Sequence, residues 1–306
     1  MLKTPVLFLI FNRPDTTQKV FDSIRIAKPK TLFIAADGPR VGNSNDQNLC
    51  EITRKIVSNI DWPCEVKTLF RETNLGCGKA VSEAITWFFD QVDCGIVLED
   101  DCLPELSFFQ FCETMLLKYK DDKEIAIISG MNYLYHGIKV FNNDYFKTSY
   151  ASIWGWASWK RVMTDIEWDI EKLKPPVNTS LFYETFPKHT RIADWLYSII
   201  NLTFEKKIDT WDTIFLYNLI LKKMKNIMPV KNQISNIGKI GTHTNESGAS
   251  PNLYTKTYNI DFYYEINCTL DDKYNDVMFV NIENLVYPKI SFFTKLKNKI
   301  CKKILN

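Results

Sequence analysis

The feature that most constrains this chain is a short apolar run, Gly95–Leu98, that ends in three consecutive carboxylates, Glu99, Asp100 and Asp101. Apolar residues without alternation are typical of a strand that is buried on both faces, and Pro104 marks the turn that follows. Adjacent carboxylates repel one another, and burying one unpaired costs several kcal/mol. We therefore expect a positively charged partner at the carboxyl end of this strand.

A divalent cation is one such partner. Mg²⁺ and Mn²⁺ prefer carboxylate oxygens and often bind through one or two carboxylates together with the phosphates of a substrate. In open α/β sheets, ligands collect at the carboxyl ends of the strands, where this cluster would lie. The alternative is an acidic strand-to-helix loop in which Asp100 or Asp101 merely caps the following helix.

The first 130 residues alternate short apolar runs with segments of helical period, which predicts βαβ units and a mostly parallel sheet. The strands are expected at 6–11, 32–36, 66–70, 95–98 and 125–129. The helices are expected from Pro14, over 48–60, from about Gly78 and over 106–119, with a further helix over 211–225 in which Ile214, Tyr217, Leu221 and Met224 form the buried stripe. The fold class is thus α/β, with a Rossmann-like central sheet flanked by helices.

The pattern loosens after residue 130, and tryptophan and tyrosine become frequent between Tyr133 and Trp168, as in binding loops over a scaffold. We expect a nucleotide-binding half over 1–130, a second half over 131–285 that binds the acceptor, and a basic tail over 286–306. Residues 290–305 have apolar residues at helical spacing among lysines. This amphipathic helix would either lie on an anionic membrane surface or dock on its own domain.

Charge and cysteine content narrow the class of protein. The net charge is +2, but the tail holds six lysines and no acidic residue, so the rest of the chain is net acidic and nucleic acid is not an expected partner. The eight cysteines show no zinc-site spacing and no secretory signal precedes them, which favours reduced thiols in a cytoplasmic protein. No apolar run approaches the ~18 residues of a membrane-spanning helix.

Four further positions suit a ligand site, and each has a plain structural alternative. Asp37 ends another apolar strand, where it could contact a ligand or initiate the Asp-Gly-Pro turn. The turn before Lys79 contains glycines and leads into a helix, which suits phosphate contact weakly. Asp212 begins a helix, where a carboxylate is favoured whatever its function. His243 lies in a polar loop, where a lone histidine is usually solvated.

Together these segments resemble GT-A-fold glycosyltransferases, most closely bacterial family 2-like enzymes and the N-acetylglucosaminyltransferase I group. The resemblance spans roughly residues 4–245 and rests on segments in this order: Phe11–Pro14, Ala36–Arg40, Asn74–Gly76, Leu98–Asp101, Trp154–Trp156, Trp211–Asp212 and Ser235–His243. It implies that Asp101 and His243 hold Mn²⁺ (or Mg²⁺) and that Asp212 is the general base. It also implies nucleotide or sugar contacts for the following residues: Asn12, Arg13, Asp37, Lys79, Glu99, Asp100 and Trp156.

The function expected from this resemblance is a metal-dependent, inverting glycosyltransferase. It would move a sugar from a nucleoside diphosphate sugar, UDP favoured, to a surface-glycan or lipid-linked acceptor. The family has two acids after the tryptophan, whereas Asp212 is followed by Thr213. One alternative is a sugar-phosphate nucleotidyltransferase, although the N-terminal Gly-rich loop of that class is missing here. Another is a non-catalytic nucleotide- or glycan-binding protein recruited to a membrane by its tail.

Overall fold

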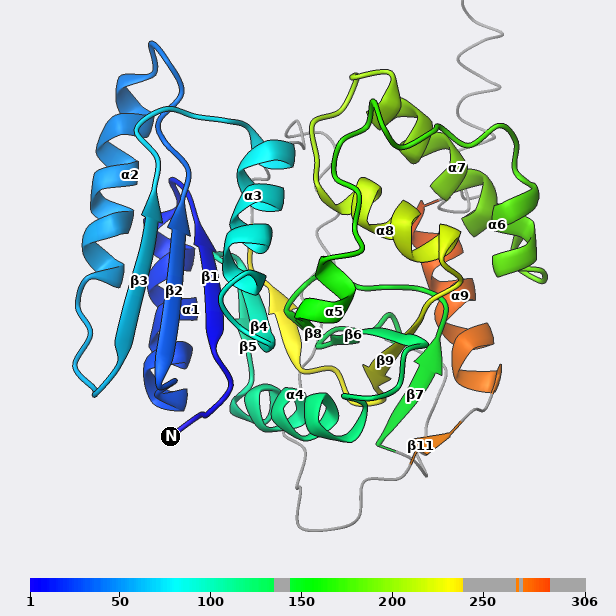
Figure 1. The fold of residues 1–306 in the computed structure, drawn as a ribbon, viewed down its shortest axis with the longest axis horizontal. Helices are drawn as coiled ribbons and strands as arrows, with labels where there is room; N and C mark the ends of the chain where they lie inside the picture. Colours follow the sequence, from blue (N-terminus) through cyan, green and yellow to red (C-terminus); the bar gives the residue numbers. More distant parts are fainter. Residues whose placement is uncertain (135–143, 239–267, 270–271, 287–306) are drawn as a thin grey trace, which may run out of the picture.

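The computed structural model describes residues 1–134, 144–238, 268–269 and 272–286, and within them the chain forms a mixed sheet flanked by helices (Figure 1). The main sheet has nine strands in the order β11-β7-β9-β6-β8-β4-β1-β2-β3. Its strands are β1 Val6–Ile10, β2 Thr31–Ala36, β3 Glu65–Phe70, β4 Cys94–Glu99, β6 Ile125–Ser129, β7 Tyr145–Thr148, β8 Trp156–Trp159, β9 Lys225–Pro229 and β11 Cys268–Thr269. Two short strands, β5 Cys102–Pro104 and β10 Ile234–Asn236, pair antiparallel beside it.

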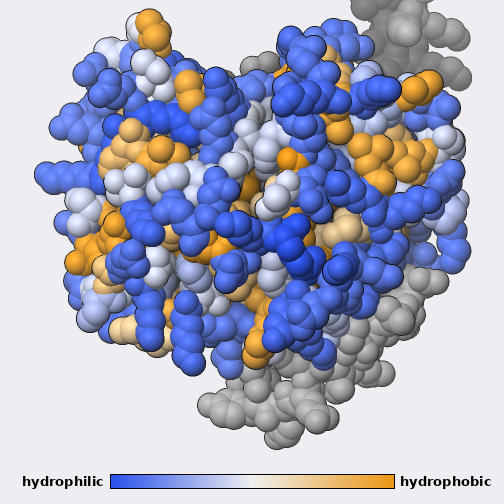
Figure 2. Space-filling view, in the orientation of Figure 1, coloured by the Kyte–Doolittle hydropathy of each residue, from blue (hydrophilic) through white to orange (hydrophobic). Residues whose placement is uncertain are grey.

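The helices form two layers around the sheet. They are α1 Pro14–Ala27, α2 Ser44–Val57, α3 Cys77–Phe89, α4 Leu106–Lys118, α5 Lys160–Met163, α6 Ser180–Thr185, α7 Thr190–Phe204, α8 Asp212–Leu221 and α9 Asp272–Val286. Helix α1 packs against α2 and α4, whereas α3 packs against α5 and, in Figure 1, lies in front of the sheet with α1 behind it. Helices α6, α7, α8 and α9 pack together beside the other half of the sheet. Hydrophilic residues cover most of the face seen in Figure 2, and hydrophobic residues form small patches between them.

Strand β1 is the centre of the first half of the sheet. All of its residues are buried, and it pairs in parallel with β2 on one side and β4 on the other. Ile10 lies opposite Ala36, and Leu9 lies opposite Glu99, so the three strands end at the same edge. From β1 the chain first moves outward through β2 and β3 and then returns to β4, which makes the space between β1 and β4 a topological switch point, where ligands of such sheets bind.

The second half of the sheet joins the first through an antiparallel strand. Strand β8 pairs antiparallel with both β4 and β6, and β7 pairs antiparallel with β9. The remaining pairs, including β6 with β9, are parallel. The expected Rossmann-like, mostly parallel sheet is confirmed. The antiparallel strands β7 and β8 were not foreseen, because they lie in the aromatic stretch where no period is visible.

The structure agrees with the expected strands and helices of the first 130 residues to within a few residues and corrects one later helix. Helix α8 ends at Leu221, and its residues Thr213 to Ile220 are all buried, so it is enclosed on every side and has no single buried stripe. Leu221 is 41% exposed, and Met224 lies beyond the helix. A helix surrounded by α6, α7 and the sheet needs apolar residues all round, which a one-face pattern does not anticipate.

Several sequence expectations remain predictions. The amphipathic tail over 290–305, with its membrane role, lies outside the described residues, and the domain boundaries at 130 and 285 stay predictions, as does the cytoplasmic location. Across the part of the chain that the structure describes, no helix is both long and apolar enough to cross a membrane.

Candidate functional site

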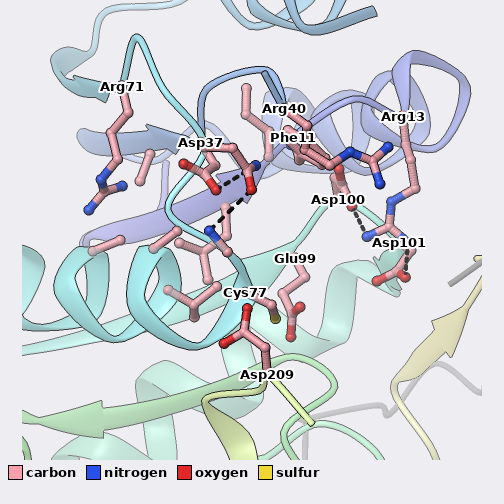
Figure 3. A pocket seen from close by; sticks show the side chains of 18 residues that line it. Phe11, Arg13, Asp37, Arg40, Arg71, Cys77, Glu99, Asp100, Asp101 and Asp209 are labelled. Carbon is pink, nitrogen blue, oxygen red and sulfur yellow. Dashed lines mark hydrogen bonds and ion pairs between the residues drawn. The ribbon is translucent and has the colours of Figure 1, made fainter. Parts of the chain in front are cut away.

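A pocket of about 370 Å³ opens at the edge where β1, β2 and β4 end (Figure 3). Its inner wall is apolar and comes from β1, β2 and α3: Leu9, Ile10, Ala35, Ala80, Val81 and Ala84. The rest of its lining is charged and polar: Arg13, Asp37, Arg40, Arg71, Asn74, Glu99, Asp100, Asp101 and Asp209. An apolar slot with convergent polar groups at the carboxyl edge of the sheet is the usual form of a small-molecule site.

The expected positive partner of the acidic cluster is a side chain of the protein itself. Arg13 pairs through Nη2 with Asp100 and through Nη1 with Asp101 Oδ2, at 2.6 Å in the second case. Asp100 is 2% exposed, and its other oxygen accepts a hydrogen bond from the backbone N–H of Phe11. The guanidinium thus joins the loop after β1 to the loop after β4, which holds the mouth of the pocket in one arrangement.

Two carboxyl groups of the acidic cluster have raised pKa values. Burial raises the pKa of Asp100 to about 6, although Arg13 opposes the shift. Burial, followed by repulsion from Asp101, raises the pKa of Glu99 well above its usual range. Within the described residues no hydrogen bond or ion pair reaches the Glu99 carboxylate, which lies beside Cys77 and Asp209 in Figure 3. Glu99 is therefore a carboxyl group held toward its neutral form on the wall of the pocket.

Asp37 organises the opposite end of the pocket. Its carboxylate accepts hydrogen bonds from the backbone N–H groups of Gly38 and Leu75 and from Asn74 Nδ2, at 2.9 to 3.0 Å. Burial raises the pKa of Asp37, and the bonds from Leu75 and Gly38 oppose it. A Cβ on Gly38 would lie 2.4 Å from the backbone of Thr73, so only glycine fits there. Asp37 lines the pocket and ties the loop after β2 to the loop after β3, and its expected contact with a ligand stays a prediction.

Asn12 acts through a buried carboxylate. It does not line the pocket but donates a 2.7 Å hydrogen bond from Nδ2 to Asp46 Oδ1, and Asp46 in turn pairs with Arg40. Asp46 is 1% exposed. The Arg40 guanidinium lies 5.9 Å from the centroid of the Phe11 ring, over the mouth of the pocket. Asn12 thus acts on Arg40 through Asp46, and the nucleotide contact expected of Asn12 stays a prediction.

The N-terminus of α3 already has an anionic partner. Asp209 Oδ1 accepts a hydrogen bond from the Gly78 N–H at 3.1 Å, and Gly76 has φ +83°, a conformation that favours glycine. A Cβ on either glycine would lie within 2.5 Å of an Asp209 carboxylate oxygen. Lys79 is 66% exposed, pairs with Glu83 and is not among the lining residues of the pocket. The phosphate contact expected of this turn stays a prediction, and Asp209, an acid without a role in the sequence expectations, lies at this helix end.

Asp212 lies behind the pocket wall. Its Oδ1 accepts hydrogen bonds from the Thr213 N–H and the Thr210 hydroxyl at the start of α8. Its charge nevertheless contributes to raising the pKa of both Glu99 and Cys77, which places it close to that wall. Asp212 is not among the lining residues of the pocket, and its role as a general base stays a prediction.

The aromatic segment does not present Trp156 to a ligand. Trp156 is fully buried and stacks on Phe89 and Trp211, with Phe215 tilted against it. The sugar contact expected of Trp156 is therefore corrected: the ring belongs to the core between the sheet and α8. The reason is its position in β8, where alternate side chains face the helical layer.

A second segment covers Asp101. The Ile237 N–H donates to the Asp101 carbonyl at 2.8 Å, and a Cβ on Gly238 would lie 2.6 Å from Asp101 Oδ2. The antiparallel pairing of β10 with β5 brings residues 235–238 to Asp101. His243 lies outside the described residues, so its expected approach to the metal stays a prediction.

The chemistry of the donors suits a hard cation, but the arrangement is occupied by Arg13. Carboxylate oxygens are the ligands that Mg²⁺ and Mn²⁺ prefer, and Asp101 is 14% exposed at the pocket. Among the described residues, however, no three His, Cys, Asp or Glu side chains are arranged to hold a metal ion. The residue types therefore fit the expected metal, and Asp101 and Glu99 are the ones that would hold it after Arg13 has moved.

The sequence analysis did not assign a role to some lining residues. Arg40 was quoted in a motif without a role, and Arg71 follows the end of β3 directly. Position at the carboxyl end of a strand is the signal that would have found Arg71. Asp209 gave no such signal, because only the contact between the loop before α8 and the start of α3 brings it to the pocket.

Comparison with known proteins gives partial structural likenesses. No protein-family model and no curated protein sequence matches this chain. Among solved structures, HddC from Yersinia pseudotuberculosis has a TM-score of 0.31 at 10% identity, covering 53% of this chain and 79% of that one. The 4-diphosphocytidyl-2C-methyl-D-erythritol synthase from Anaerococcus prevotii has a TM-score of 0.37 at 10% identity, covering 60% and 84%. The inositol-1-phosphate CTP transferase from T. maritima has a TM-score of 0.30 at 10% identity, covering 54% and 74%.

The expected glycosyltransferase activity is corrected. Two of the similar structures are named as an inositol-1-phosphate CTP transferase and a putative glucose-1-phosphate thymidylyltransferase, names that correspond to the alternative, a sugar-phosphate nucleotidyltransferase, and not to sugar transfer to a glycan acceptor. The likenesses extend over part of a sheet-and-helix framework.

Proposed function

We propose that the pocket binds a nucleotide and that the chain is a transferase that joins a nucleotide to a sugar phosphate. The observation that carries this proposal is the apolar slot at the switch point between β1 and β4, with arginines and carboxylates along its rim. A volume of about 370 Å³ lies within the range of pockets that enclose small ligands, roughly 300 to 1,000 Å³.

The shape and chemistry of the slot suit the parts of a nucleotide. A flat base would lie against Ala80, Val81 and Ala84, whose small side chains leave the wall of α3 smooth. Polar edges of the base would face Asp37 and Asn74 at the end of the slot. Phosphates would meet the guanidinium groups on the rim, since arginine matches phosphate geometry with two parallel hydrogen bonds.

In the proposed reaction, an oxygen of the sugar phosphate attacks the α-phosphorus of a nucleoside triphosphate. The new P–O bond forms as the bond between the α-phosphorus and its bridging oxygen breaks, and pyrophosphate leaves. Arg40 would orient the phosphates, and Arg13 would neutralise charge near Asp100 and Asp101. A divalent cation held by Asp101, if bound, would supply further charge stabilisation on the phosphates.

The proposal is tested by pyrophosphate release. The protein is incubated with each common nucleoside triphosphate and a panel of sugar 1-phosphates, with Mg²⁺ or Mn²⁺, and pyrophosphate is measured by a coupled enzyme assay. Nucleotide binding is measured in parallel by thermal unfolding, because a ligand at about 100 times its Kd stabilises the native state by roughly 2.7 kcal/mol. We expect one nucleotide to bind and to release pyrophosphate in the presence of its sugar phosphate.

A matched pair of variants assigns the signal to the pocket. Arg40→Gln removes a rim guanidinium and should weaken binding, whereas Arg25→Gln removes a guanidinium from α1, where it pairs with Asp22 and Asp61 outside the pocket. Binding of a nucleotide without pyrophosphate release from any sugar phosphate would refute the reaction. Failure of every nucleotide to bind the folded protein would refute the site as well.

A further inference from the structure

Arg13 is placed so that its side chain, rather than its backbone, is free to change partners. It immediately precedes Pro14, the first residue of α1, and its carbonyl accepts a hydrogen bond from the Thr17 N–H at 3.0 Å. The main chain is thus fixed to the helix. The side chain is 26% exposed, and both of its ion pairs face the pocket. A small rotation about its side-chain bonds would turn the guanidinium from the carboxylates toward the slot.

We infer that Arg13 is the resident counter-cation of Asp100 and Asp101, and that a divalent cation binds Asp101 only by displacing it. The inference deepens the proposed function, because it assumes that a divalent cation accompanies the nucleotide at this site. Arg13 then couples the two ligands: a guanidinium released from the carboxylates by the metal becomes available to the phosphates.

Arg13 and a divalent cation would compete for the same oxygen of Asp101. Arg13 Nη1 lies 2.6 Å from Asp101 Oδ2, and the same oxygen faces Gly238, whose Cβ position lies 2.6 Å from it. Mg²⁺ needs oxygen ligands at about 2.0 to 2.1 Å in a nearly octahedral shell. An ion at that distance from Oδ2 would meet the guanidinium, while the second oxygen, Oδ1, lies 3.6 Å from Cys102 Sγ.

Other charges near the cluster do not replace Arg13 in this role. Arg40 is engaged by Asp46, and Arg71 pairs with Glu83. Among the described residues, Arg13 alone is ion-paired with Asp100 or Asp101. Glu99, which has no hydrogen-bond or ion-pair partner among those residues, would be the second carboxylate available to a metal once the guanidinium has moved.

The test is Mn²⁺ binding to the nucleotide-free protein, measured by electron paramagnetic resonance of free Mn²⁺. The variants are Arg13→Gln and the double variant Arg13→Gln/Asp101→Asn, with Arg71→Gln as a control that removes the same charge from the same pocket without touching the pairs. A neighbouring opposite charge changes the affinity of a carboxylate for a proton by about 10- to 1,000-fold. We therefore expect Arg13→Gln to bind Mn²⁺ at least about tenfold more tightly than the wild type.

The gain in Mn²⁺ affinity should vanish in the double variant Arg13→Gln/Asp101→Asn and be small in Arg71→Gln. Unchanged or weaker binding in Arg13→Gln would overturn the inference, as would an equal gain in Arg71→Gln or a gain that survives Asp101→Asn. If Arg13→Gln does not fold without metal, Arg13→Lys is used, because a shorter side chain with a single nitrogen replaces the two guanidinium nitrogens that reach Asp100 and Asp101 separately. Arg13→Lys should gain less Mn²⁺ affinity than Arg13→Gln. Its thermal midpoint should also rise more on adding Mn²⁺ than the midpoint of the wild type does. If neither measurement differs from the wild type, the inference is overturned.

Nucleotide binding without metal separates this inference from the proposed function. If a nucleotide stabilises the wild type but Mn²⁺ affinity does not respond to Arg13, the role of Arg13 is refuted and the nucleotide site stands. If Mn²⁺ affinity responds as expected and no nucleotide binds, Arg13 competes with a metal as inferred and the proposed function fails.

Discussion

The substitution Asp46→Asn isolates the network that holds Arg40 over the pocket. Asp46 is 1% exposed and lies in the first turn of α2, where its carboxylate accepts from Asn12 and Arg40. Asparagine keeps the shape but turns one acceptor oxygen into a donor, which would face one of these donors. The variant should therefore lose both the buried hydrogen bond and the orientation of the guanidinium.

The expected loss of stability follows from two contributions. A hydrogen bond to a charged group contributes about 1.5 to 3 kcal/mol, and the 2.7 Å bond from Asn12 is of this kind. The pair with Arg40 contributes about 0.2 to 1 kcal/mol, because the Arg40 side chain is 51% exposed and solvent screens the charges. We expect Asp46→Asn to lower the free energy of unfolding by about 2 to 4 kcal/mol at pH 7, measured by urea unfolding.

The loss of stability caused by Asp46→Asn should become smaller at low pH. The hydrogen bond from Arg40 lowers the pKa of Asp46, against the effect of burial. A lowered carboxyl pKa contributes stability above the unfolded value, about 3.9, which is lost as the pH falls through the folded value. The difference between wild type and Asp46→Asn should thus be full at pH 7 and shrink below about pH 4.

Asp61→Asn is the matched control, because Asp61 is 68% exposed and pairs with Arg25 at 3.3 Å on the surface. It should change stability by less than about 1 kcal/mol. If Asp46→Asn proves no more destabilising than Asp61→Asn, or if nucleotide affinity is unchanged while Arg40→Gln reduces it, the positioning role assigned to Asp46 is wrong.

Three further outcomes are expected. Gly76→Ala should destabilise the protein by about 1 to 3 kcal/mol, because φ is +83° and the new Cβ would meet Asp209. The double variant Gly76→Ala/Asp209→Ala should recover part of this stability. A double-mutant cycle without coupling would contradict the contact. Trp156→Ala should cost about 3 to 5 kcal/mol by calorimetry without changing nucleotide affinity in the folded protein, since the ring is fully buried; a stable variant with weakened binding would restore Trp156 to the site. Burial raises the pKa of Cys77 to about 12, so its thiol should resist iodoacetamide at pH 8 until the protein unfolds. Peptide mass spectrometry measures the modification, and rapid modification of Cys77 in the native protein would refute this.

The local pattern of the sequence was sufficient for the first half of the sheet. Strand β4 and the acids at its tip were predicted because a continuous apolar run followed by carboxylates depends on neighbouring residues alone. The same holds for Asp37 at the end of β2, since the carboxyl ends of parallel strands meet at one edge. Helices with one buried face, such as α1, were found for the same reason.

Tertiary contacts decided the rest of the site. The sequence indicated that the acidic cluster needs a positive partner, but only the pairing of β1 with β4 shows that Arg13, in the loop after β1, is that partner. Asp209 reaches the first turn of α3 across a separation of 131 residues. The burial of Trp156, which looked like a ligand-stacking residue, depends on the packing of α8 against β8.

The sequence by itself therefore determined which side chains stand at the ends of the strands, and the tertiary structure decided which of them face one another. Periodicity records how each segment divides between core and solvent, because that division depends on local geometry. The periodicity of the sequence does not predict that Arg13 contacts Asp101 or that Gly78 contacts Asp209, because those contacts form only when separate layers pack. The pairing of carboxylates with arginines in the pocket is therefore decided by how the layers pack.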